Sequence, residues 1–146
     1  MLKIDLANIE KEKIENHTSK GNQPKWRVDN KWYKADHMGY EALAEYVVSE
    51  LLKKSNVENF VVYDLVEIEY DNKISVGCVS DNFRKDYEML IPIEKLHRQY
   101  FGKGLADTLA DKQSTEDKII YTVKFIEKIT GLENVGEYFS VMLAVD

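Results

Sequence analysis

Alternating apolar and polar residues predict several short strands in the first half of the chain. Residues 1–8 alternate in this way and are expected to form a short edge strand. Strand-forming residues on both sides of Asp29-Asn30 predict a hairpin, because this dipeptide favours a two-residue turn. Residues 60–70 and 74–79 flank Asp71-Asn72 and predict a second hairpin. Together these segments predict a small antiparallel sheet.

A helical pattern separates the two hairpins. Leu43, Val47 and Leu51 recur every four residues and predict a helix over residues 38–54 with an apolar stripe. Asp36 precedes this segment and is expected to cap its N-terminus.

The second half of the chain has the pattern of helices. Ser114 and Gly131 are expected to cap the two ends of the longest one. The polar residues 107–117 are expected to form a solvated connector. The predicted helices span residues 93–100, 115–130 and 135–146. The predicted fold class is therefore α+β.

Composition narrows the functional classes. The formal net charge of −6 over 146 residues argues against binding to nucleic acid, because an acidic surface repels phosphate. No stretch approaches the roughly 20 apolar residues that span a membrane. The single cysteine, Cys78, cannot form an internal disulfide, and no secretory signal is visible at the N-terminus. A cytoplasmic location is expected.

The candidate chemistry is a lysine followed by a helical glutamate. Lys34 lies at the end of a predicted strand, and Glu45 lies on the helix that follows, with Glu41 as an alternative one turn earlier. A strand lysine presents a positive charge to phosphate groups, and a helical glutamate holds that lysine in place. Taken alone, each of these residues is more commonly a solvated surface charge.

Four segments occur in an order that resembles the HipA-like serine/threonine protein kinases. Residues 19–25 are similar to the family's serine/glycine–glutamine–lysine loop, and residues 31–34 to the strand with its nucleotide-binding lysine. Residues 41–52 resemble the first long helix, in which a glutamate followed by an aromatic residue recurs, and this pattern selects Glu45. Residues 71–79 resemble the hairpin that enters the adenine-contacting hinge. The resemblance covers roughly residues 18–96 and the last helix, and CtkA-type kinases are the most similar members.

The resemblance implies a protein-kinase-like N-lobe over residues 1–96, in which a small antiparallel sheet packs on a long helix. Residues 97–146 would be the helical start of an incomplete C-lobe. The implied cofactors are ATP and Mg²⁺, and the implied reaction is ATP-dependent phosphorylation of a protein serine or threonine. The nucleotide-binding residues carried over from the family are Ser19, Gly21, Gln23, Lys25, Lys34, Glu45, Val79 and Ser80.

The sequence departs from the family at its catalytic residues. The family's Asn-x-Asp-Arg-His-x-x-Asn loop and the metal-binding aspartate after it are not present, and residues 137–146 resemble the helix that leads into that loop. No catalytic residue and no metal ligand is therefore assigned, and the chain alone is expected to be inactive or nearly so. The expected partners are a nucleotide and either a protein substrate or a missing C-lobe.

Two alternatives remain open. The first is a noncatalytic regulatory or binding subunit of a split HipA-like kinase of the toxin–antitoxin type. This reading predicts an exposed apolar patch around Phe139, Val141, Met142 and Val145. The other alternative is an unrelated α+β domain, which a large distance between Lys34 and Glu45 would favour.

The remaining candidates are expected to be structural. The three histidines have no metal-ligand spacing, which argues against a zinc site. Cys78 lies in an apolar strand and is expected in the core. Core packing is also expected, in preference to base stacking, for Trp26, Trp32 and Tyr33.

Overall fold

The computed structural model describes residues 1–9, 23–85 and 87–145. The chain is α+β and divides into two compact units, Met1–Tyr87 and Glu88–Asp146. The boundary between the units lies in the connector after the last strand, whereas the resemblance implies a boundary after residue 96, which lies inside a helix.

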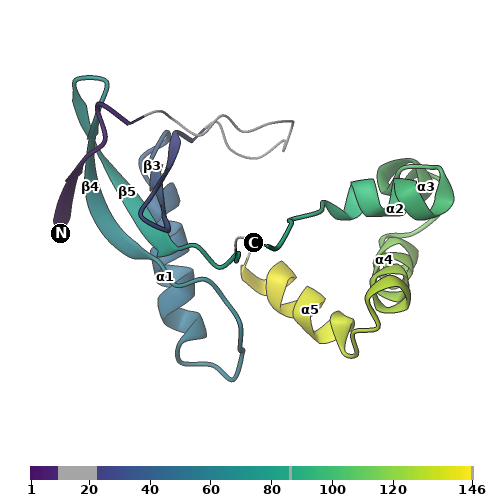
Figure 1. The fold of residues 1–146 in the computed structure, drawn as a ribbon. Coiled ribbons are helices and arrows are strands. Elements are labelled where there is room, and N and C mark those ends of the chain that lie inside the picture. The colour runs from purple at the N-terminus through teal and green to yellow at the C-terminus, as the bar shows by residue number, and fades with distance from the viewer. Residues whose placement is uncertain (10–22, 86, 146) are drawn as a thin grey trace. The chain divides into compact units, whose positions relative to one another are not determined.

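The first unit contains a five-stranded sheet with the strand order β1-β4-β5-β3-β2 (Figure 1). β1 pairs with β4 in parallel, and every other neighbouring pair is antiparallel. The sheet is therefore mixed, and the prediction of a purely antiparallel sheet was wrong at β1. The strands are β1 (Leu2–Asp5), β2 (Lys25–Val28), β3 (Lys31–Ala35), β4 (Asp64–Tyr70) and β5 (Lys73–Asp81).

Both predicted hairpin turns are confirmed. Asp29 and Asn30 have φ values of 48° and 63°, and Asp71 and Asn72 have values of 49° and 58°. Positive φ at both central residues is the requirement of the tight turn whose twist matches that of the flanking strands. Aspartate and asparagine adopt this left-handed backbone conformation more readily than other non-glycine residues do.

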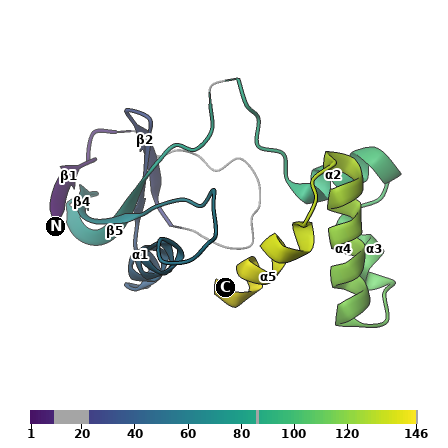
Figure 2. The same ribbon diagram turned by 90° about the horizontal axis from the view of Figure 1, so that it is seen from below.

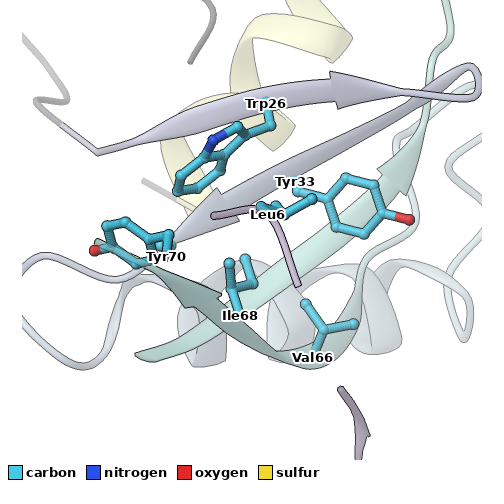
Figure 3. Close-up of a cluster of buried hydrophobic side chains, with 7 residues drawn as sticks. Leu6, Trp26, Tyr33, Val66, Ile68 and Tyr70 are labelled. Carbon is cyan, nitrogen blue, oxygen red and sulfur yellow. The ribbon is translucent and has the colours of Figure 1, made fainter. Parts of the chain in front are cut away.

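The main core of this unit lies on one face of the sheet (Figure 3). It contains Leu6, Trp26, Tyr33, Ala35, Val66, Ile68 and Tyr70, all at least nine-tenths buried. The Trp26 ring meets Tyr70 edge-on at 4.9 Å between centroids, although β2 and β4 are not neighbours in the sheet. The sheet therefore curls around this cluster. Each large side chain buried here contributes roughly 1.5–3 kcal/mol to folding.

Helix α1 (Glu41–Leu52) packs on β4 and β5, as Figure 2 shows in a view along the helix. It buries Ala42 and Ser49, whereas the predicted apolar stripe of Leu43, Val47 and Leu51 is exposed. The helix was correctly predicted, but the face it buries was not. The buried face carries small and polar side chains, which hydropathy alone does not distinguish from a solvated face.

The start of α1 also differs from the prediction. The helix begins at Glu41, three residues later than expected, and Tyr40 occupies the N-cap position. Asp36 still satisfies one amide of the first turn, because its Oδ1 accepts a hydrogen bond from the Ala42 N–H at 2.6 Å. Asp36 thus caps the helix from a position outside it.

The second unit is helical. Its helices are α2 (Ile93–Phe101), α3 (Leu105–Ala110), α4 (Thr115–Thr130) and α5 (Val135–Val145). The caps of α4 are confirmed: Ser114 Oγ accepts from the Asp117 N–H at 3.0 Å, and Gly131 ends the helix with a φ of 68°. α3 overlaps the segment expected to be a loop, so that prediction was wrong for residues 107–110.

The core of the second unit is built around His97. Its ring is 1% exposed and lies 4.7 Å from the Phe125 ring and 4.9 Å from the Phe101 ring, between centroids. Its two nitrogens lie 2.7 Å from the Lys103 carbonyl oxygen and 2.9 Å from the Tyr121 hydroxyl. Both nitrogens are therefore satisfied, which is the condition for burying an imidazole at low cost. Within the ranges described, no helix is both long and apolar enough to cross a membrane.

Candidate functional site

Lys34 and Glu45 form an ion pair on the face of the sheet opposite the main core. Alternation along β3 directs Lys34 towards α1, because its neighbours Tyr33 and Ala35 belong to the main core. The Lys34 ammonium lies 2.7 Å from Glu45 Oε1 and 2.9 Å from Oε2. The two side chains are only 19% and 29% exposed. The pair is thus largely removed from solvent.

Two further side chains complete this cluster. The Tyr63 hydroxyl lies 3.1 Å from the Lys34 ammonium, which also lies 4.8 Å from the centre of the tyrosine ring. Cys78 is paired with Lys34 across β3 and β5, and its thiol donates to Glu45 Oε2 at 3.2 Å. The Ser49 hydroxyl on α1 accepts from the Tyr63 N–H at 3.3 Å and holds that segment against the helix. Sequence reasoning had assigned no contact to Tyr63 and only a core position to Cys78.

Charge in the cluster follows from these contacts. Burial lowers the pKa of Lys34, but hydrogen bonding and attraction from Glu45 outweigh it, so the net shift is upward. Burial, followed by the charge of Glu45, raises the pKa of the Cys78 thiol far above its usual range. Lys34 is therefore a permanent cation at neutral pH, and Cys78 is a permanent donor with no nucleophilic thiolate.

Lys25 lies directly opposite Lys34 in the antiparallel pair of β2 and β3. Burial lowers the pKa of Lys25, the positive charge of Lys34 lowers it further, and Glu45 partly offsets both. Within the residues that the structure describes, the Lys25 side chain has no hydrogen-bond or ion-pair partner. The carboxylate of Glu45 thus attracts both ammonium groups.

Asp36 adds a second carboxylate beside the cluster. It is 8% exposed, and only its Oδ1 has a hydrogen-bond donor in the described part of the chain, since Oδ2 is buried without one. Burial raises the pKa of Asp36, and the nearby Glu41 and Glu45 raise it further. This carboxylate is therefore easier to protonate than an ordinary aspartate.

Of the two candidate glutamates, Glu45 is the one that meets Lys34. The Glu41 carboxylate instead accepts from the N–H groups of His37 and Met38 at 3.0–3.2 Å, just before the helix. Burial raises the pKa of Glu41, but the hydrogen bonds from the backbone N–H groups around the start of the helix together outweigh it, so the net shift is downward. Glu41 is therefore a helix-end residue.

The other residues carried over from the resemblance are more dispersed. Ser19 and Gly21 lie outside the described residues. Gln23 is half-buried, and its Nε2 has no hydrogen-bond partner in the described part of the chain. Val79 and Ser80 lie inside β5, opposite Tyr33 and Trp32 of β3. Their backbone groups belong to the sheet, and the connector begins only after Asp81.

No protein-family model matches this chain, and no curated protein or solved structure is significantly similar to it. Across residues 1–9, 23–85 and 87–145, no group of three or more histidine, cysteine, aspartate or glutamate side chains is placed to hold a metal ion. The chemistry that this cluster offers is therefore the placement of positive charge beside an oriented carboxylate. Such an arrangement suits an anionic ligand.

Proposed function

We propose that this chain is the nucleotide-binding N-terminal part of a HipA-like, ATP-dependent serine/threonine protein kinase. The observation that carries the proposal is the contact between the Lys34 ammonium and both oxygens of Glu45. A protein-kinase N-lobe depends on such a pair between a strand lysine and a helical glutamate. The five-stranded sheet with one helix packed against it is consistent with that architecture.

In this proposal Lys34 and Glu45 provide the charged centre at which the phosphates of ATP bind. The connector after Asp81 takes the role of the adenine-contacting hinge, because Val79 and Ser80 are already paired within the sheet. No group of three or more potential metal-ligating side chains occurs among the described residues. In this proposal Mg²⁺ enters as the counter-ion of ATP, and no phosphoryl transfer is assigned to the residues of this chain.

The direct test is the melting temperature of the protein with and without millimolar ATP–Mg. Binding to the folded state alone raises the melting temperature, and Lys34→Ala is expected to abolish the rise. Lys31→Ala is the matched control, because Lys31 lies on the same strand in an exposed pair with Asp81. A wild-type protein whose melting temperature does not respond to ATP–Mg would contradict the proposal.

The second candidate is a noncatalytic subunit that docks on a catalytic partner. The observation in its favour is the apolar surface of α5, where Met142 and Val145 are exposed and Phe139 and Val141 are half-buried. This candidate predicts that Met142→Lys weakens a complex with a separately produced HipA-like catalytic lobe, as measured by size-exclusion chromatography. A complex unaffected by that substitution, or no complex with the wild type, would exclude docking through α5.

A further inference from the structure

The outer face of α1 carries an apolar stripe that stays exposed in the part of the chain that the structure describes. Leu43, Val47 and Leu51 form this stripe and are 51%, 44% and 61% exposed. The helix packs on β4 and β5 through another face, where Ala42 and Ser49 are buried. Residues four apart are neighbours on a helix surface, so the three side chains form one continuous patch. A patch of this kind, unlike a single exposed leucine, indicates an interaction surface.

The stripe is self-complementary. Val47 lies at its centre, and Leu43 and Leu51 lie about one turn to either side. When a second α1 packs on it in the opposite direction, Val47 meets its own copy, and Leu43 of each chain meets Leu51 of the other. Rows of residues four apart interdigitate in the commonest class of helix packing. The stripe therefore meets the requirement of a two-fold contact, in which the same patch is used on both subunits.

The charges at the two ends of α1 favour this antiparallel direction. Glu41 lies in the first turn, and Lys53 and Lys54 lie at the C-terminal end. An antiparallel pair places each basic end beside the acidic first turn of the other helix and opposes the two helix dipoles. It also brings the exposed Lys54 towards the exposed ring of Tyr40 on the other copy. A parallel pair would instead place lysines beside lysines, so the charges match a second copy in the antiparallel direction.

We propose that α1 is the interface of a homodimer, in which the stripe packs antiparallel on the stripe of a second copy about a two-fold axis at Val47. The helix has 12 residues and is about 18 Å long. The buried area is therefore at the lower end for specific interfaces, and the dimer should form only at micromolar concentrations or above. This inference goes beyond the proposed function and does not rest on it, because Glu45 faces Lys34 of the sheet and not the stripe.

Disulfide trapping of single substitutions tests the register of the two helices. Val47→Cys is expected to give a disulfide-linked dimer on mild air oxidation, because a residue on the axis meets its own copy. Leu43→Cys and Leu51→Cys should link to each other when mixed, at least about tenfold faster than either links to itself. The wild type, whose single Cys78 is buried, is the blank. Leu132→Cys, which lies in the second unit at an exposure close to that of Leu51, is the control for random collision.

Sedimentation velocity over the micromolar range measures association without added cysteines. Val47→Glu should weaken dimerisation at least about tenfold, because it places two like charges against each other on the axis. Since Val47 is exposed, the circular dichroism spectrum of the variant should match that of the wild type. Leu132→Glu is the matched control and should leave the dissociation constant of the dimer unchanged.

Two kinds of result would overturn the inference. One is a wild type that stays monomeric at high micromolar concentration, which would leave the stripe to another protein or to the helical unit of the same chain. The other is a dimer with a different interface or direction. Association that Val47→Glu does not weaken would show a different interface, and Leu43→Cys that links to itself faster than to Leu51→Cys would show a parallel pair.

Discussion

Each unit of this protein buries one polar cluster, and the two clusters differ in how fully their hydrogen bonds are satisfied. In the second unit, both nitrogens of His97 have partners, and aromatic rings surround the imidazole. In the first unit, Lys34 and Glu45 are well paired, but Lys25 and one oxygen of Asp36 have no partner among the described residues.

From this contrast we expect the second cluster to be structural, and the proposed function assigns a ligand to the first. A buried polar group with every hydrogen bond satisfied rigidifies a core and has no need of a ligand as a further partner. The repulsion between the Lys25 and Lys34 ammonium groups costs folding free energy, and a bound anion would reduce that cost. Removing a member of each cluster should therefore have different consequences for stability and for binding.

The largest effect on stability is expected from His97→Ala. The substitution leaves a cavity beside Phe125 and two unpaired polar groups, and it should lower the free energy of unfolding by about 3–4 kcal/mol. Both tryptophans of the chain lie in the first unit, so urea unfolding followed by far-ultraviolet circular dichroism should shift more than unfolding followed by tryptophan fluorescence.

The exposed His37 provides the control for this experiment. His37→Ala should leave both transitions within about 0.5 kcal/mol of the wild type. The rise in melting temperature with ATP–Mg, proposed for the first unit, should also survive His97→Ala. An unchanged dichroism transition in His97→Ala would show that the imidazole does not hold the second unit together.

A smaller loss is expected from Lys34→Met, which leaves Glu45 without its cation. The cost should be about 2–3 kcal/mol, below the roughly 3–5 kcal/mol of fully buried pairs because both side chains keep some exposure. Tryptophan fluorescence should report it. Adding Glu45→Leu should recover most of the loss, since it removes the unpaired carboxylate. Lys31→Met, in a pair exposed to solvent, should cost less than about 1 kcal/mol.

The reactivity of the Cys78 thiol tests whether solvent reaches the cluster around Lys34 and Glu45. Its thiol is fully buried, and its pKa is raised by burial and by Glu45. Reaction with a thiol reagent at pH 8 should therefore be at least about tenfold slower in the folded protein than in urea. Equal rates in the two states would show that the cluster opens readily to solvent.

The smallest effect concerns Asp36 and depends on pH. Because its folded-state pKa is raised above the unfolded value, the folded protein binds the proton more tightly, and stability is lost as the pH rises through the folded pKa. Asp36→Asn cannot ionise and should be more stable than the wild type by about 0.5–1 kcal/mol at pH 7. The difference should shrink towards pH 3. A variant that is less stable at pH 7 would contradict this account.

Local signals predicted much of the fold. Paired Asp-Asn turns specified both hairpins, and Ser114 with Gly131 specified the ends of α4, because these residues act through their own backbone geometry. The face that α1 buries was not predictable from hydropathy. The helix contacts the sheet through Glu45 and the segment before β4 through Ser49, and it exposes Leu43.

The site was only partly visible in the sequence. The order of the motifs along the chain predicted that Lys34 and Glu45 form a pair, and the structure places them in contact. The contacts of Tyr63 and Cys78 arise from long-range pairing: Tyr63 precedes β4, and Cys78 faces Lys34 only because β5 lies beside β3. No local sequence pattern predicts that these side chains lie close together. The lack of a partner for Lys25 is likewise a property of the folded arrangement.

The most direct test of the nucleotide site is an ATP–Mg titration followed by amide chemical shifts in two-dimensional NMR. The account predicts concentration-dependent shifts concentrated in residues 23–35, around Glu45 and in the connector after Asp81, with the amides of residues 88–145 nearly unmoved. Shifts confined to the helical unit, or none at millimolar ATP–Mg, would contradict it.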